Sequence, residues 1–371
     1  MGYLSLTPLA DNKTSDGAIG KYPSTFAATD PRVHTARRKI VNHVYSMSNV
    51  ARSEQGIDTC SQLFLGDMVE AAQKGEPVDM AVWCRWYAFD VVGQLFFNRP
   101  FGFLERKEDC NNWIHATDLL MPVMITGGIV QTYVRPFLQL GAIAVPRFLR
   151  GFLAIKMFES VAEKSIADRQ VLLEKGGGIL EREDLLASLF RIMEERGKEV
   201  DFGPLEIKTE IWVALYVYLS TECRLMLISH GSLAGSDTVS VALTSILYFL
   251  MKNPEDYRKL QAEIDLATAN GQLSNPHISY SGAAKLPYLD ACIKEATRMH
   301  PSVAMSLPRH VPKGGRDIAG HFFPEGAKVG VNAMVMHRDK GVFGDDADEF
   351  KPERWFRENA ADMERHMLNV S

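Results

Sequence analysis

A run of five residues, Ala234-Gly235-Ser236-Asp237-Thr238, puts glycine, a carboxylate and two hydroxyls into the otherwise apolar segment 222–251. Glycine costs about 1 kcal/mol relative to alanine in a helix interior, and Ser, Asp and Thr prefer caps and turns. One interpretation is a long helix that opens locally, so that Asp237 and Thr238 face a flat ligand packed against the glycine. The other is a turn in which either residue caps a new helix beginning at Val239. These residues alone leave both interpretations open.

Two further motifs combine acidic and basic residues. Glu295 and Arg298 are spaced i, i+3 on a predicted helix that Pro301 ends. Farther along, Pro352-Glu353-Arg354-Trp355 predicts an extended turn with a second arginine beside large aromatic residues. The simpler alternatives are a solvent-exposed ion pair worth about 0.5 kcal/mol or less, and an ordinary loop with an aromatic anchor. Taken singly, neither motif identifies a function.

The composition excludes several classes of protein. The chain has 371 residues, of which 46% are hydrophobic, and its net charge of −5 offers no basic field for nucleic acid. Its 5 cysteines include no Cys-x-x-Cys pair, which argues against a disulfide framework or a zinc site and favours a reducing compartment. Residues 1–30 hold no apolar run of the kind that a signal peptide or membrane anchor needs, and we expect them to be poorly ordered or a remnant loop.

The order of predicted elements indicates the fold class. Helical periodicity dominates residues 31–299, and short apolar runs broken by Gly and Pro in 316–335 predict two or three strands of a small sheet. Without β–α alternation, the prediction is a mainly α fold with a minor β part, in a single domain over 1–371. Residues 119–158 are apolar but interrupted by Pro, Gly and Arg. That pattern favours core packing over a spanning helix, and it leaves open a peripheral membrane contact or the roof of an apolar pocket.

In this order, the motifs resemble the cytochrome P450 family of haem-thiolate monooxygenases. The resemblance rests on Ala234–Thr238 in a long helix, on Glu-x-x-Arg followed by His300-Pro301, and on the turn at 352–355. Shorter runs agree with the family in the same order: Leu286-Pro287-Tyr288-Leu289, Leu307-Pro308-Arg309, Phe323-Pro324-Glu325-Gly326, Met336-His337-Arg338-Asp339 and Val342-Phe343-Gly344-Asp345. Two upstream runs, 87–93 and 100–103, are similar to fungal microsomal members of the pisatin demethylase type. The resemblance extends over about residues 31–356.

The resemblance implies roles for the residues of the first motif. Thr238 would hydrogen-bond the iron-bound dioxygen, and Asp237 would relay protons toward its distal oxygen. Ala234 and Gly235 would let the haem or the substrate approach the helix backbone. Short polar side chains at a gap in an apolar wall suit these tasks, and the sequence offers them at this point.

The resemblance also implies a charged framework around the haem. Glu295, Arg298 and Arg354 would form a buried ion network, which is costly to break because the loss of one partner leaves a buried charge unpaired. Arg38 and Arg309 would pair with haem propionates, because a guanidinium suits a carboxylate. His34 would assist Arg38, or it is an ordinary histidine of an amphipathic helix.

One departure from the family pattern concerns the iron ligand. The family's ligand is a cysteine in a Phe-x-x-Gly-x-x-x-Cys-x-Gly loop shortly after the turn at 352–355, whereas residues 357–371 contain neither cysteine nor glycine. None of the chain's five cysteines lies in a comparable loop: Cys60, Cys84, Cys110, Cys223 and Cys292. No family-like anchor region precedes residue 1 either. The sequence is therefore expected to be the middle of a monooxygenase, truncated at both ends, inactive as written and without a metal-ligating residue.

The expected parent function is haem-dependent insertion of one oxygen atom of O₂ into an apolar or aromatic small molecule. Residues 119–134 and 302–307 would line the substrate pocket. NADPH-derived electrons would arrive from a flavoprotein reductase docking near Arg37 and Lys39, at the cytosolic face of the endoplasmic reticulum membrane. Without an anchor, the chain itself would be cytoplasmic. The alternatives are a non-catalytic product and a helical protein that binds hydrophobic ligands.

The segment just before the first motif suggests a separate hypothesis about the gene. Thr209-Glu210 recurs as Thr221-Glu222, and the twelve residues 210–221 are unusually apolar for a connecting loop. They could therefore translate an unspliced or misannotated intron.

Overall fold

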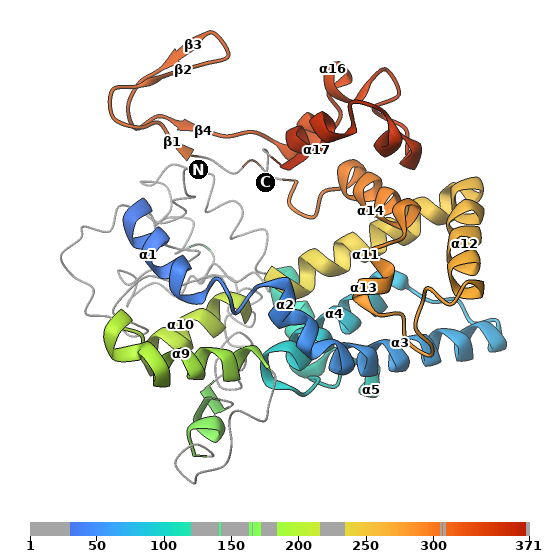
Figure 1. The fold of residues 1–371 in the computed structure, drawn as a ribbon, viewed down its shortest axis with the longest axis horizontal. Helices are drawn as coiled ribbons and strands as arrows, with labels where there is room; N and C mark the ends of the chain where they lie inside the picture. The colour runs from blue at the N-terminus through green and yellow to red at the C-terminus, as the bar shows by residue number, and fades with distance from the viewer. Residues whose placement is uncertain are drawn as a thin grey trace. The chain divides into compact units, whose positions relative to one another are not determined.

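The computed structural model describes residues 30–119, 141, 163–164, 166–171, 184–215, 234–304, 306 and 309–368. In these ranges helices prevail and the strands are few and short, which confirms the prediction of a mainly α fold with a minor β part (Figure 1). The chain divides into two compact units, an N-terminal unit (1–78 and 86–237) and a C-terminal unit (79–85 and 238–371). That all 371 residues form a single domain stays a prediction.

The N-terminal unit contains helices whose ends follow local sequence signals. Asp30 precedes the first helix and accepts a hydrogen bond from the backbone N–H of Arg32 at 2.8 Å, and Asp184 caps a later helix through the N–H of Ala187 at 2.6 Å. The helices are α1 (Pro31–Val41), α2 (Met47–Val50), α3 (Glu54–Lys74), α4 (Met80–Phe97), α5 (Phe103–Arg106), α9 (Leu185–Val200) and α10 (Pro204–Leu215), with 3-10 turns η1 (Ala51–Ser53) and η2 (Cys110–Asn112). Only the part of α4 from Trp86 on belongs to this unit.

A buried carboxylate organises the core of this unit. Asp90 on α4 is 1% exposed, and its two oxygens accept hydrogen bonds from the backbone N–H groups of Gly102, Phe103 and Leu104 at 2.7–3.2 Å. Burial raises the pKa of the Asp90 carboxyl, although these backbone bonds oppose the shift. The rings of Phe103 and Trp113 pack on each other beside this turn. The carboxylate thus fixes the start of α5 against α4.

The C-terminal unit is built from a second set of helices and four short strands. Helix α11 (Ala234–Lys252) belongs to this unit from Thr238 onward. Helix α14 (Pro287–Met299) is fixed at its start by Glu263 of α12. The Glu263 carboxylate accepts hydrogen bonds from the N–H groups of Tyr288 and Leu289 at 2.8 and 3.0 Å. The remaining helices are α12 (Pro254–Ala269), α13 (Tyr280–Ala283), α15 (Ala333–Met336), α16 (Lys340–Phe343), the 3-10 helix η4 (Pro352–Phe356) and α17 (Ala360–Leu368).

The strands form two separate antiparallel pairs. β1 (Arg309–His310) pairs with β4 (Lys328–Val329), and β2 (Arg316–Ile318) pairs with β3 (His321–Phe323). Ala319 and Gly320 join β2 to β3 with φ of 51° and 79°, which matches a two-residue turn with both φ angles positive. The expectation of one small sheet over 316–335 is thus wrong in detail. Residues 333–336 form α15, because the side chain of Asn332 caps a helical turn there.

Several stretches singled out in the sequence lie wholly or partly outside the described residues. These are residues 1–29, all of 119–158 except Leu119 and Gly141, and residues 216–221 of the apolar dodecapeptide. Residues 210–215 form the last part of α10. Of the helices that the structure does describe, none combines the length and the apolar composition that a transmembrane span requires.

Candidate functional site

The C-terminal unit contains a buried cluster of three charged side chains. Arg298 donates two parallel hydrogen bonds to the Glu295 carboxylate, Nε to Oε2 and Nη2 to Oε1, both at 2.8 Å. Arg354 adds a third contact, from its Nε to Oε1 of Glu295 at 3.2 Å. All three side chains are 0% exposed. The interpretation of Glu295 and Arg298 as a surface pair is therefore wrong.

The remaining polar atoms of this cluster also find partners. The guanidinium of Arg298 donates to the backbone carbonyls of His337, Ala347 and Glu349 at 2.7–3.0 Å. The Glu295 carboxylate accepts from the backbone N–H of Lys351 at 3.0 Å and from the indole N–H of Trp355 at 3.1 Å. Buried charges are tolerable only when they are paired and hydrogen-bonded in this way. The cluster thus fastens α14 to residues 337–355.

Asp346 extends the cluster toward the surface. Its carboxylate accepts hydrogen bonds from the guanidinium groups of Arg357 at 2.8 Å and Arg354 at 2.6 Å, and from the ammonium of Lys351 at 3.1 Å. These donors, Arg357 foremost, hold the pKa of Asp346 well below its usual range although partial burial opposes them.

The Ala234–Thr238 motif forms the first turns of α11. The described helix runs from Ala234 to Lys252, so the interpretation in which these residues are a turn and the helix starts at Val239 is wrong. A Cβ at Gly235 would lie 3.2 Å from Cγ2 of Val92 on α4, which is tight enough to favour glycine for close helix packing. Asp237 and Thr238 are half-buried.

A contact from outside the helix meets the motif at its last residue. The hydroxyl of Ser302, just after α14, donates a hydrogen bond to the backbone carbonyl of Thr238 at 2.8 Å. The bond joins residues 64 positions apart in the sequence. No residue spacing in the sequence indicates it.

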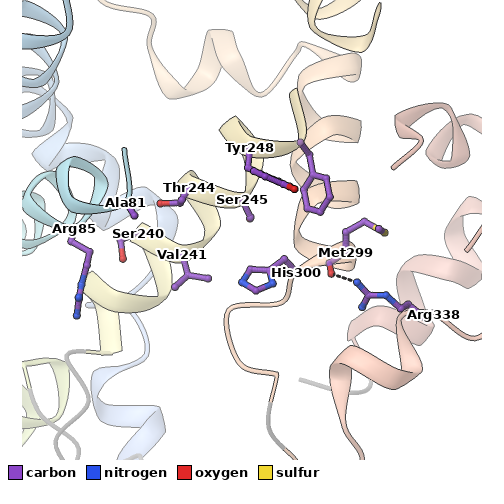
Figure 2. Close-up of a pocket in the computed structure, with 11 residues that line it drawn as sticks. Ala81, Arg85, Ser240, Val241, Thr244, Ser245, Tyr248, Met299, His300 and Arg338 are labelled. Carbon is purple, nitrogen blue, oxygen red and sulfur yellow. Dashed lines mark hydrogen bonds between the residues drawn. The ribbon is translucent and has the colours of Figure 1, made fainter. Parts of the chain in front are cut away.

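A cavity of about 410 Å³ lies along the same helix within the C-terminal unit. Figure 2 shows Val241, Thr244, Ser245 and Tyr248 of α11 on one side of it and the end of α14 on another. The described residues that line it are Ala81, Arg85, Ser240, Val241, Thr244, Ser245, Tyr248, Phe249, Met299, His300 and Arg338. Of the predicted pocket residues 302–307, the described ones, 302–304 and 306, do not line it, and nearly all of 119–134 lies outside the described residues. The i, i+3, i+4, i+7 spacing from Val241 to Tyr248 is the sequence signal that could have indicated this face.

The predicted propionate partners lie in different units. On α1 of the N-terminal unit, His34 is buried and Arg38 is exposed; burial first and the Arg38 charge second lower the pKa of His34. Arg309 is half-buried in β1 of the C-terminal unit, paired with Val329. Arg38 and Arg309 thus belong to different elements, α1 and β1, and their pairing with haem propionates stays a prediction.

The reductase-docking expectation needs one correction. Arg37 is only 9% exposed, and its Nη1 donates to the backbone carbonyl of Asp201 at 2.9 Å. Asp201 follows the last residue of α9, where unsatisfied carbonyls attract cationic donors. Lys39, two residues along α1, is exposed.

The cysteines of the described residues do not fit the thiolate ligand that haem iron would need. Cys60, Cys84, Cys110 and Cys292 are at most 2% exposed. Burial raises the pKa of all four thiols, to about 12 for Cys60 and Cys292. A thiolate ligand requires the opposite environment. The fifth cysteine, Cys223, lies outside the described residues.

Removing Arg298 should destabilise the protein far more than removing an exposed arginine of the same spacing. We expect Arg298→Ala to lower the free energy of unfolding by about 3–5 kcal/mol, because it leaves the Glu295 carboxylate buried without its main partner. Arg365, which pairs i, i+3 with Asp362 and is 73% exposed, is the matched control, and Arg365→Ala should cost less than about 1 kcal/mol. Denaturant titration followed by circular dichroism measures both values, and equal losses would contradict the assigned role of the buried cluster.

The charge of Asp346 should make part of the stability depend on pH. Because its pKa is lower in the folded than in the unfolded chain, its contribution is fully present above the unfolded value of about 4 and is lost as the pH falls toward the folded value. The gap in unfolding free energy between the parent chain and Asp346→Asn should therefore narrow as the pH falls below about 4. Asp348, which is 66% exposed, is the control, and Asp348→Asn should give a small gap at every pH.

Comparison with known proteins identifies the family to which this chain is similar. Residues 9–368 match the sequence profile of the family described as cytochrome P450. A cytochrome P450 monooxygenase of Penicillium aethiopicum is 37% identical over 351 residues, which are 94% of this chain and 66% of that protein. One of Alternaria alternata is 35% identical over 318 residues, or 86% of this chain and 79% of that protein. Pisatin demethylase of Fusarium vanettenii is 32% identical over 337 residues, or 90% of this chain and 60% of that protein.

These matches also show how much of its relatives' length the chain covers. It spans somewhat less than two thirds of the Penicillium and Fusarium relatives. The matched residues nevertheless include the α11 motif, the buried cluster and the strands β1 to β4. This chain belongs to the cytochrome P450 family.

Proposed function

We propose that this chain forms the oxygen-activating side of a monooxygenase and is not a passive helical scaffold. The reaction inserts one atom of O₂ into an apolar or aromatic small molecule. The second oxygen atom leaves as water, formed with two electrons derived from NADPH and two protons. The observation that carries the proposal is the pair Asp237 and Thr238 in the first turns of the largely apolar helix α11. The relatives named as monooxygenases support it.

The residues of this chain would handle protons and exclude water. The Asp237 carboxylate can bind and release a proton, whereas the Thr238 hydroxyl both donates and accepts hydrogen bonds. The apolar side chains of α11 would keep bulk water from the reacting oxygen. Because the described cysteines do not fit an iron ligand, the proposed roles are limited to proton transfer, positioning and exclusion of water.

Membership of the family implies haem as the cofactor, and we assign this chain's other polar residues to its surroundings. Arg38 and Arg309 would pair with its propionates, with His34 beside Arg38. Ala234 and Gly235 would form the part of the helix backbone that the cofactor or the substrate approaches. The tight packing of Gly235 on Val92 is a second reason, independent of the cofactor, for a glycine at this position.

The partners and the location of the enzyme follow from the family. Electrons would come from an NADPH-dependent flavoprotein reductase, and the exposed Lys39 on α1 is a candidate docking residue. The parent enzyme would work at the cytosolic face of the endoplasmic reticulum membrane. Residues 119–158 would supply a peripheral membrane contact.

A second function is supported by two observations in the C-terminal unit. The cavity beside α11 has a volume of about 410 Å³, which is within the usual range for a small-molecule site. The described cysteines are buried and protonated. A protein that binds a hydrophobic ligand without transforming it would need the first feature and not a thiolate.

Reconstitution with haem tests whether any thiol of this chain ligates the iron. We expect this chain, loaded with haem, reduced and exposed to carbon monoxide, to lack the red-shifted band of a thiolate-ligated centre, because the described thiols are buried with raised pKa values. A thiolate-type band would contradict that expectation. The same measurement on Cys223→Ser would then show whether Cys223 is the ligand.

The role of the α11 motif can be tested by the fate of reducing equivalents. In a chain extended by the family's cysteine loop, Thr238→Ala should retain haem binding but raise the peroxide formed per NADPH consumed, because proton delivery is disturbed. Asp237→Asn should slow turnover, because an amide does not titrate. Thr268→Ala is the control and should leave coupling unchanged, because Thr268 is exposed on α12 and its hydroxyl donates to the carbonyl of Ile264 in the same helix. If peroxide per NADPH is the same in Thr238→Ala and the parent enzyme, the motif has no part in proton delivery.

A further inference from the structure

The hydroxyl of Ser302 bonds to a helix that is distant from it in sequence. Its Oγ donates to the backbone carbonyl of Thr238 at 2.8 Å, and the contact is half-buried. Thr297, in the preceding helix α14, behaves differently. Its hydroxyl donates to Ile293 and Lys294 of the same helix at 2.9 and 3.0 Å, as threonines in helices commonly do. The Ser302 bond is therefore a link between two segments and not a local capping interaction.

The carbonyl that receives this bond lies in the first turns of α11. As an α-helical carbonyl it also faces the N–H of Ala242, four residues on, and a carbonyl oxygen has two lone pairs for two donors. A second hydrogen bond at this point restrains the opening and the rotation of the turn that carries the Thr238 side chain.

The segment that carries Ser302 is itself firmly anchored. Four residues earlier, Arg298 is held by Glu295 and three backbone carbonyls, all in the buried cluster. The carbonyl of Met299 accepts a hydrogen bond from Nη2 of Arg338 at 2.7 Å, drawn as a dashed line in Figure 2. Pro301 is buried and has a fixed φ angle. Little freedom is left between the cluster and Ser302.

We propose that Ser302 is a positioning residue for Thr238. Through its hydroxyl, the buried cluster at the end of α14 sets the orientation of the first turns of α11, and so directs the side chain that the proposed function uses for proton delivery. This inference rests on that proposed function for its biological meaning. The link itself is a property of the backbone carbonyl and requires neither haem nor substrate.

Hydrogen–deuterium exchange of the full chain tests the link directly. In Ser302→Ala, the amide of Ala242 and its neighbours in 239–245 should exchange about fivefold faster, the factor expected for losing one neutral hydrogen bond. Ser302 lies in a different peptide, so the intrinsic exchange rate of the reporter segment does not change. Ser302→Thr keeps the hydroxyl and should restore slow exchange.

Two matched controls separate positioning from general stability. Thr297→Val removes a hydroxyl of α14 that does not reach α11, and it should leave exchange in 239–245 unchanged. Thr238→Ala keeps the accepting carbonyl and should not speed exchange there, because alanine favours the helix. The Thr238 variant therefore tests the proposed function through coupling, whereas the Ser302 variant tests the link through exchange, and either can fail alone.

Two results would overturn the proposal. One is unchanged exchange in 239–245 of Ser302→Ala. The other is an equal acceleration across α11, α12 and α14, which would mean that Ser302 only adds to global stability. If the alanine variant does not fold, Ser302→Cys replaces it. A thiol fills the site but is a weak donor, so faster exchange confined to 239–245 supports the link and the same two results contradict it.

Discussion

The carboxylate of Glu295 is the point on which the C-terminal unit depends. It accepts hydrogen bonds from Arg298, Arg354, the backbone of Lys351 and the indole of Trp355. An isolated ion pair at this depth would be a poor source of stability, because desolvation offsets most of the attraction. Here the donors come from α14 and from residues 351–355, so the carboxylate specifies how these segments meet. The cost of burying the charge is offset by the completeness of its hydrogen bonding.

The same cluster reaches the α11 motif through a short and rigid path. Arg298 fixes the last turn of α14, Arg338 holds the carbonyl of Met299, and Pro301 restricts the chain that follows. Ser302 then contacts the carbonyl of Thr238. The ion cluster is thus connected to Thr238, the residue of the α11 motif that belongs to the C-terminal unit.

The described thiols do not fit the thiolate ligand that the family's haem chemistry requires. Membership of the cytochrome P450 family is shown by the match over residues 9–368, whereas Cys60, Cys84, Cys110 and Cys292 all have environments that disfavour a thiolate. Their burial identifies them as small apolar core residues. Among the described residues, the roles we propose in the chemistry therefore belong to Asp237 and Thr238 of α11 and to the arginines assigned to the haem propionates.

Local signals in the sequence determined much of the helical framework. Helix starts and ends are marked by residues that act only on their close neighbours in the chain. Examples are Asp30 and Pro31 at the start of α1, Pro287 at the start of α14 and Pro301 after its end. Such helix ends can therefore be predicted from the sequence. The i, i+3 spacing of Glu295 and Arg298 likewise fixed their proximity. Family resemblance then supplied the expectation that Arg354 joins them, which spacing alone could not.

Only the tertiary structure decided which of these groups are buried and what they contact. Arg37 looks like a surface cation in the sequence, yet it donates to the carbonyl of Asp201. Ser302 and Thr238 are 64 residues apart, and the helical turn after Asn332 replaces an expected strand. Periodicity and spacing report contacts along one helix or strand. A hydrogen bond between distant segments depends instead on how those segments pack, and packing is set by the whole chain at once.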